Sequence, residues 1–268
     1  MTERTATPLP SPAPAGPSRR AVLRGALATT LAAPAALHGP RAARAAGASG
    51  PMGVVEMFTS QGCSSCPPAD KVLSELIEGG EAIGLSHHVD YWDYLGWKDT
   101  LASPEATARQ YAYARAFGRR GVYTPQAVVN GRTHHVGSRG GEVRARLKGD
   151  ATAGIAPDRL VTLTREGERI GIVVEGAAAE ADLVLVRYDK QHEQVIERGE
   201  NRGRTITYHH PVREVRAIGA WDGTTGAVTA ALPPAERAGG VAVLLQARAA
   251  GGAPGPILGA GALALADA

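Results

Sequence analysis

The chain contains only two cysteines, Cys63 and Cys66, and two serines separate them. This spacing lets both sulfur atoms meet across one turn at the start of a helix, so a disulfide can close and reopen without unfolding the surrounding chain. At a helix N-terminus, free backbone N–H groups and the helix dipole favour a thiolate. We therefore expect Cys63 to be the nucleophile and Cys66 to resolve the mixed disulfide that Cys63 forms with a substrate.

Glu56 and Pro125 are further candidates for the chemistry of this pair. Glu56 stands in an otherwise apolar segment, residues 54–59, that is typical of a central strand, where a buried carboxylate is costly. We expect it either to have a structural partner or to accept the proton of the resolving thiol. Pro125 precedes another predicted strand, where a cis bond would bring the backbone of Thr124 beside the disulfide to bind an extended substrate. The alternative is an ordinary trans proline at a strand start.

An aromatic and acidic segment, residues 88–99, follows a predicted strand. Because α/β folds place ligand-binding loops at strand ends, this segment supplies three candidate substrate-binding residues, His88, Asp90 and Trp92, alongside Thr124. The alternative is an aromatic cap over the edge of the core, in which the aspartates form turns.

A metal site is the second chemistry that the cysteine pair allows. Two cysteines are half of a tetrahedral site, and the chain has no second pair. Cys63, Cys66 and His88 would be the ligands of such a site, and their softness suits copper. Adjacent histidines on a strand point to opposite faces, so at most one of His87 and His88 could serve. The leading expectation is neither a metal nor an organic cofactor, only a redox-active Cys63–Cys66 disulfide.

The elements predicted around these residues alternate between strand and helix. They are a strand at 54–59, a helix at 67–78, a strand at 82–89, a helix from the N-cap Ser103 to 118, strands at 126–130 and up to 136, and a helix near 142–148. This βαβαββα order, with Cys-x-x-Cys before the first helix, predicts an α/β thioredoxin-like domain over residues 46–150.

Helical periodicity is absent beyond residue 151. Six short apolar runs alternate there with glycine-rich or polar turns, at 159–164, 170–175, 183–188, 205–209, 215–220 and 241–247. This spacing predicts a mostly β, sandwich-like domain over residues 151–268. It also allows a third interpretation of the protein, a binding module in which the β domain recognises a partner and the disulfide is only a clamp.

The first 45 residues have the features of a twin-arginine signal peptide. Arg19 and Arg20 precede an uncharged apolar run at 26–37, and Ala43 and Ala45 are the small residues expected before a cleavage site. The run is too short to span a bilayer. We therefore expect export by the twin-arginine route to the periplasm or the medium.

The basic character of the chain belongs to this segment. Residues 1–45 hold six of the 29 basic residues and one of the 26 acidic residues, which leaves the remainder with a net charge near −2. No basic cluster remains to indicate nucleic acid or an anionic membrane as a partner. We expect a protein or small-molecule thiol or disulfide as substrate, a redox partner protein, and no membrane span once the signal is removed.

Several motifs together resemble the DUF1223 family. They are residues 55–70 (VEMFTSQGCSSCPPAD), 88–99, 123–126 (YTPQ), 129–131 (VNG), 197–201 (ERGEN) and 205–209. The resemblance covers nearly all of the mature chain and implies an exported protein with a thioredoxin-like domain. By similarity to thioredoxin-like proteins in general, Cys63 and Cys66 match the redox pair and Pro125 the cis-proline position. One departure is that Gly62, and not an aromatic residue, precedes Cys63, which is unlike a general thioredoxin-type reductase. The leading prediction is an exported thiol-disulfide oxidoreductase.

Overall fold

The structure is a computed structural model that describes residues 51–155, 160–175, 179–232 and 239–265. The predicted signal peptide, residues 1–45, lies outside these ranges. The described residues all belong to one compact unit. Within the described ranges, no helix has both the length and the apolar character needed to cross a membrane.

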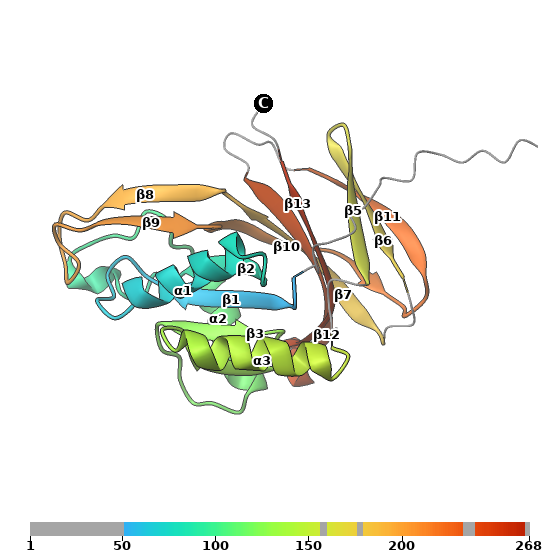
Figure 1. Cartoon of the computed structure of the whole chain (residues 1–268), viewed down its shortest axis with the longest axis horizontal. Helices are drawn as coiled ribbons and strands as arrows, with labels where there is room; N and C mark the ends of the chain where they lie inside the picture. The colour runs from blue at the N-terminus through green and yellow to red at the C-terminus, as the bar shows by residue number, and fades with distance from the viewer. Residues whose placement is uncertain (1–50, 156–159, 176–178, 233–238, 266–268) are drawn as a thin grey trace, which may run out of the picture. The chain divides into compact units, whose positions relative to one another are not determined.

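The first half of this unit alternates between strands and helices. Its elements are β1 (Val54–Thr59), α1 (Pro67–Glu78), β2 (Ile83–His88), the short 3-10 helix η1 (Asp93–Leu95), α2 (Pro104–Ala116), β3 (Gln126–Val129), β4 (Thr133–Val136) and α3 (Gly140–Thr152) (Figure 1). The four strands form one sheet in the order β2-β1-β3-β4. Strands β1 and β2 are parallel, whereas β3 is antiparallel to both β1 and β4. The predicted βαβαββα order is confirmed.

Local sequence signals set the starts of the first two helices. Helix α1 begins at Pro67, where the missing N–H of a proline costs nothing because the first turn of a helix leaves its N–H groups without intrahelical partners. Helix α2 begins after Ser103, whose hydroxyl accepts a hydrogen bond of 3.1 Å from the backbone N–H of Ala106. The third helix, predicted near 142–148, extends further at both ends, to Gly140–Thr152.

The second half forms three further sheets. Its strands are β5 (Val161–Glu166), β6 (Arg169–Val174), β7 (Ala181–Tyr188), β8 (Gln191–Val195), β9 (Thr205–His209), β10 (Val212–Trp221), β11 (Gly226–Ala231), β12 (Gly240–Arg248) and β13 (Pro254–Ala264), with a short 3-10 helix η3 (Ala250–Gly252) before β13. They are arranged as β10-β7-β12-β13, β11-β6-β5 and the pair β8-β9. The six predicted runs lie on β5, β6, β7, β9, β10 and β12, whereas β8, β11 and β13 were not predicted.

In the sheet β10-β7-β12-β13, the central strands β7 and β12 are buried on both faces. Leu185 of β7 and Val243 of β12 pack against Ile172 of β6 in one apolar cluster. The alternate side chains of β7 and β12 pack in a second cluster with Val54 of β1 and Leu85 of β2. Because successive side chains of a strand point to opposite faces, this sheet joins the first half of the unit to the outer sheet β11-β6-β5. The fold is a mixed α/β arrangement of several sheets and few helices. The division into two domains at 150/151 stays a prediction.

Candidate functional site

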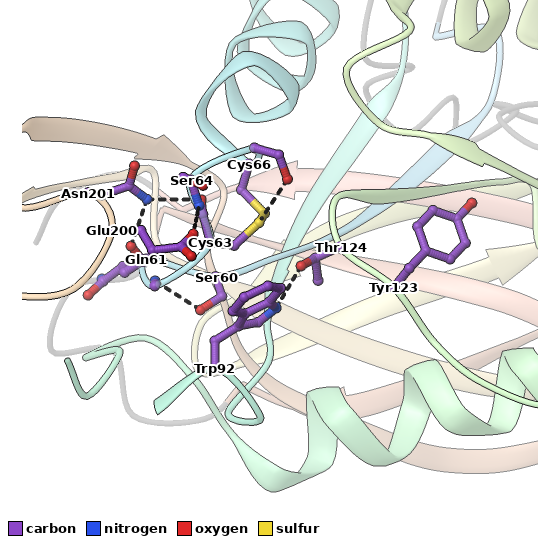
Figure 2. The surroundings of a disulfide bond; sticks show 12 residues. Ser60, Gln61, Cys63, Ser64, Cys66, Trp92, Tyr123, Thr124, Glu200 and Asn201 are labelled. Carbon is purple, nitrogen blue, oxygen red and sulfur yellow. Dashed lines mark hydrogen bonds between the residues drawn. A yellow bond between two sulfur atoms is a disulfide. The ribbon is translucent and has the colours of Figure 1, made fainter. Parts of the chain in front are cut away.

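Cys63 and Cys66 form a disulfide at the N-terminus of α1 (Figure 2). Cys66 is the N-cap residue, and its carbonyl oxygen accepts hydrogen bonds from the backbone N–H groups of Ala69 and Asp70 at 2.8 and 3.1 Å. Both cysteines are 0% exposed. The two serines between them are exposed to solvent. The disulfide is therefore closed off from solvent although the tip of its loop is open.

The segment between β8 and β9 contacts the backbone of this redox loop, residues 60–66. We call residues 196–204 the β8–β9 loop. The buried Asn201 donates from Nδ2 to the carbonyl oxygens of Gln61 and Cys63, both at 2.9 Å. Glu200 accepts a hydrogen bond of 3.1 Å from the backbone N–H of Ser64. The side chain of Ser64, and then this backbone hydrogen bond, lower the pKa of Glu200. In the view of Figure 2, these two residues lie on one side of the redox loop, and Trp92 and Thr124 lie on the other.

A buried carboxylate fixes the same loop from within the protein. Asp99 Oδ2 accepts a hydrogen bond from the backbone N–H of Gln61 and lies 2.8 Å from Nδ1 of His88. Burial raises the pKa of Asp99, but His88 and the N–H donors outweigh burial and hold this pKa below its ordinary value. His88, predicted to bind substrate, is thus engaged inside the protein.

Trp92 and Thr124, two of the predicted substrate-binding residues, lie beside the redox loop. The indole Nε1 of Trp92 donates a hydrogen bond of 2.7 Å to Oγ1 of Thr124. A Cβ atom on Gly62 would lie 3.2 Å from Cβ of Trp92, which is tighter than an ordinary contact. Gly62 therefore suits the position before Cys63, because Trp92 from another loop lies where a side chain on residue 62 would begin. The peptide bond between Thr124 and Pro125 is cis.

The remaining predicted substrate-binding residue, Asp90, is held by α2. Its carboxylate accepts a hydrogen bond of 2.6 Å from the hydroxyl of Thr107, and its backbone N–H donates to the same hydroxyl. Asp90 therefore connects the segment after β2 to the adjacent helix α2.

Glu56 lies at the centre of a buried polar cluster. Its carboxylate accepts hydrogen bonds from Arg109 and from the hydroxyl of Tyr113, and Nε2 of His87 lies 3.1 Å from it. Burial raises the pKa of Glu56, but Arg109 and His87 outweigh it, so the net pKa is far below the ordinary range. Arg109 also donates to Oε1 of Gln246 on β12 at 2.9 Å. Of the two expectations for Glu56, these contacts fit the structural partner.

The alternative metal ligands are not gathered into a site. In the part of the chain that the structure describes, no group of three or more His, Cys, Asp or Glu side chains is placed to hold a metal ion. His87 and His88 have different partners, Glu56 and Asp99, as expected for neighbours that point to opposite faces of β2.

Sequence reasoning missed Asn201, Glu200 and Asp99 as residues that hold the redox loop. All three come from loops distant from it in the chain. The only signal for Glu200 and Asn201 was their place in the family-like segment 197–201, and Asp99 ended the aromatic segment that was assigned to substrate binding.

We predict that Arg109→Met lowers the free energy of unfolding by about 3–5 kcal/mol, because it leaves the carboxylate of Glu56 buried without its cation. Urea denaturation of the two proteins measures the difference. Arg115→Met, an exposed arginine on the same helix, is the matched control and should be near neutral. Adding Glu56→Gln to Arg109→Met should recover part of the loss. Equal stability of the two arginine variants would contradict the pairing.

We predict that Asn201→Ala lowers the free energy of unfolding by about 1–3 kcal/mol, since two carbonyl oxygens of the redox loop lose their buried donor. A loosened contact should also speed reduction of the disulfide by dithiothreitol by about tenfold under native conditions. The rate of thiol release measures this, and Arg202→Ala, at the exposed neighbour, is the control. An unchanged rate of reduction would show that the β8–β9 loop does not protect the disulfide.

Comparison with known proteins agrees with this architecture. A family model described as protein of unknown function (DUF1223) matches residues 54–246, a range that includes both the redox loop and the β8–β9 loop. A crystal structure of a protein from Agrobacterium tumefaciens is similar at 40% sequence identity with a TM-score of 0.74, covering 81% of this chain and 96% of that one. No curated protein matches the chain significantly. Because the family model matches residues 54–246, which is more than half of the chain, the chain belongs to the DUF1223 family.

Proposed function

We propose that this protein is a thiol-disulfide oxidoreductase that acts on thiols or disulfides of exported proteins or small molecules. The observation that carries the proposal is the Cys63–Cys66 disulfide at the N-terminus of α1. There the unpaired backbone N–H groups and the helix dipole favour a thiolate once the bond is reduced. The sheet order β2-β1-β3-β4, in which helix α1 connects the parallel strands β1 and β2, supports a thioredoxin-like domain.

The proposed reaction is an exchange of two electrons between two dithiol–disulfide pairs. When the reduced protein meets a substrate disulfide, the Cys63 thiolate attacks one sulfur and releases the other as a thiolate. The Cys66 thiolate then attacks Sγ of Cys63, which closes the protein disulfide and releases the second substrate sulfur as a thiolate. The reverse sequence oxidises a substrate dithiol. The disulfide is the only redox group that this reaction needs.

Access to the disulfide requires movement of the groups around it, because both cysteines are buried. Trp92 and Thr124 lie beside the redox loop, so we propose that they contact the substrate, with Pro125 presenting the neighbouring backbone. We also propose that residues 1–45 direct export to the periplasm or the medium, which supplies thiols and disulfides as substrates.

The full burial of both cysteines favours a second candidate function. In this alternative the disulfide is a permanent clamp in a binding module, and the β sheets of the second half recognise the partner. The two candidates differ in how readily the disulfide is reduced, because a structural disulfide resists the glutathione pool.

We predict a reduction potential between about −120 and −270 mV for the Cys63–Cys66 pair, the range of exchange catalysts. The measurement equilibrates the purified protein in glutathione or dithiothreitol buffers and quantifies the free thiols. A potential below about −300 mV would exclude the oxidoreductase and select the clamp.

We predict that Cys66→Ser accumulates a stable mixed disulfide with oxidised glutathione at Cys63, because no thiol remains to resolve it. Cys63→Ser should accumulate much less under the same conditions, since Cys66 is the second thiol of the pair. Mass spectrometry of the intact reduced variants measures both adducts. Preferential labelling of Cys66 would reverse the assigned roles.

A further inference from the structure

Asp70 is a buried carboxylic acid that the proposed reaction leaves without a role. It lies on α1 four residues after Cys66, and its backbone N–H donates to the carbonyl oxygen of Cys66 at 3.1 Å. Residues four apart share one face of a helix, so the side chains of Asp70 and Cys66 lie one above the other. Asp70 is 7% exposed, and its Oδ1 atom is buried with no hydrogen-bond partner among the described residues.

Three residues that interact electrostatically with Asp70 also have unpaired buried polar atoms. Oγ1 of Thr59, Nε2 of His88 and the hydroxyl of Tyr208 are also buried, and each lacks a hydrogen-bond partner within the described ranges. They come from the end of β1, from β2 and from β9. The rings of His88 and Tyr208 meet edge to face with centroids 4.6 Å apart. Because buried polar atoms are nearly always paired, such a group under a redox loop indicates a function.

The groups that face Asp70 set its acidity. Burial raises the pKa of Asp70 to about 7, His88 and Thr59 oppose this increase, and the negative charge of Asp99 adds to it. Burial also raises the pKa of the Tyr208 hydroxyl, with the charges of Asp70 and Asp99 adding to the effect. A carboxyl with a pKa close to the working pH gives and takes protons efficiently.

Asp70 also borders a cleft at the protein surface. It lines a cleft of about 510 Å³ between α1 and β9, together with the basic residues Lys71, Arg204 and His209. A proton held by Asp70 can therefore leave to water along this cleft without crossing the core.

We propose that Asp70 is the proton acceptor for Cys66 in the step that resolves the mixed disulfide. The Cys66 thiol transfers its proton to the carboxylate of Asp70, and the resulting thiolate attacks Sγ of Cys63. The sulfur–sulfur bond to the substrate breaks, the substrate leaves as a thiolate, and the proton on Asp70 passes to water in the cleft or to this thiolate. The inference rests on the proposed oxidoreductase function. It assigns to Asp70 the role that the sequence suggested for Glu56, whose carboxylate is held by Arg109.

The test follows both steps of the reaction of the reduced protein with oxidised glutathione, by acid quenching and mass spectrometry. Asp70→Asn keeps the shape of the side chain and removes its basicity. At pH 7 it should slow the resolving step by about tenfold or more, since a general base contributes roughly 10²–10⁴-fold. Attack by Cys63 should stay within about twofold. Glu75→Gln, an exposed carboxylate on the same helix, is the matched control and should change neither step.

The pH dependence of the resolving step distinguishes a proton acceptor from a residue that only supports the fold. In the native protein the rate of the resolving step should rise with an apparent pKa of about 7. In Asp70→Asn the rise should shift toward the ordinary thiol pKa of about 8.5 or above. The pH profile of the native protein tests the proposal even when the variant does not fold. If the rate of the resolving step in the native protein rises only near the ordinary thiol pKa, the proposal is contradicted.

The raised pKa of Asp70 also predicts how the stability of the folded protein changes with pH. The folded-state pKa of Asp70 is raised from 3.8 to about 7, so its contribution to stability is present below pH 3.8 and is lost as pH rises to 7. Asp70→Asn should therefore gain stability relative to the native protein across this interval.

The outcomes separate the two proposals. A mixed disulfide that forms normally and resolves equally fast in Asp70→Asn and in the native protein overturns the role of Asp70 alone. Absence of any mixed disulfide, together with a reduction potential below about −300 mV, overturns the oxidoreductase and the role of Asp70 with it. Slow resolution confined to Asp70→Asn supports both.

Discussion

A negative charge in the middle of a buried strand is the constraint on which the rest of this structure depends. Glu56 occupies the central strand β1 and is 0% exposed, so its charge must be compensated inside the protein. Its partners come from β2 and α2, and Gln246 of β12 completes the cluster through Arg109 and Tyr113. Four elements from both halves of the chain must be in place together. Loss of one partner would leave a buried charge unpaired, which is far more costly than the net value of the pair.

The redox loop is held by groups that belong to other parts of the fold. Asp99 binds the backbone N–H of Gln61 from the inside, and Asn201 binds two of the loop's carbonyl oxygens. Trp92 lies against Gly62, where a Cβ atom would make a tight contact of 3.2 Å with Cβ of Trp92. Such a loop has little freedom of its own, because the β8–β9 loop and the segment after β2 hold its backbone.

Two buried carboxylates near the same strand have opposite properties because their partners differ. Glu56 is surrounded by cations and donors, which keep it ionised. Asp70 is buried near the negative charge of Asp99, and these two effects outweigh the opposing charge of His88, so the pKa of Asp70 is raised to about 7. A carboxylate that is permanently charged stabilises a fold, whereas one that titrates near neutrality can move a proton. The distinction depends on the partners and cannot be made from residue type.

The sequence by itself determined the first-half elements, because their signals are local. The apolar run of β1, the prolines that begin α1 and the cap at Ser103 act over a few residues, and the structure agrees with them. The proximity of Cys63 and Cys66 was also local, since two residues separate them. Strands β8 and β13 escaped prediction because QHEQV is polar and the segment 254–264 is rich in glycine and alanine. These two segments form strands because they pair with neighbouring strands. Only the tertiary structure brought Asn201 to the redox loop, placed Arg109 against Glu56 and left Oδ1 of Asp70 buried with no hydrogen-bond partner among the described residues. Each of these depends on contacts between residues far apart in the chain, which no local pattern encodes.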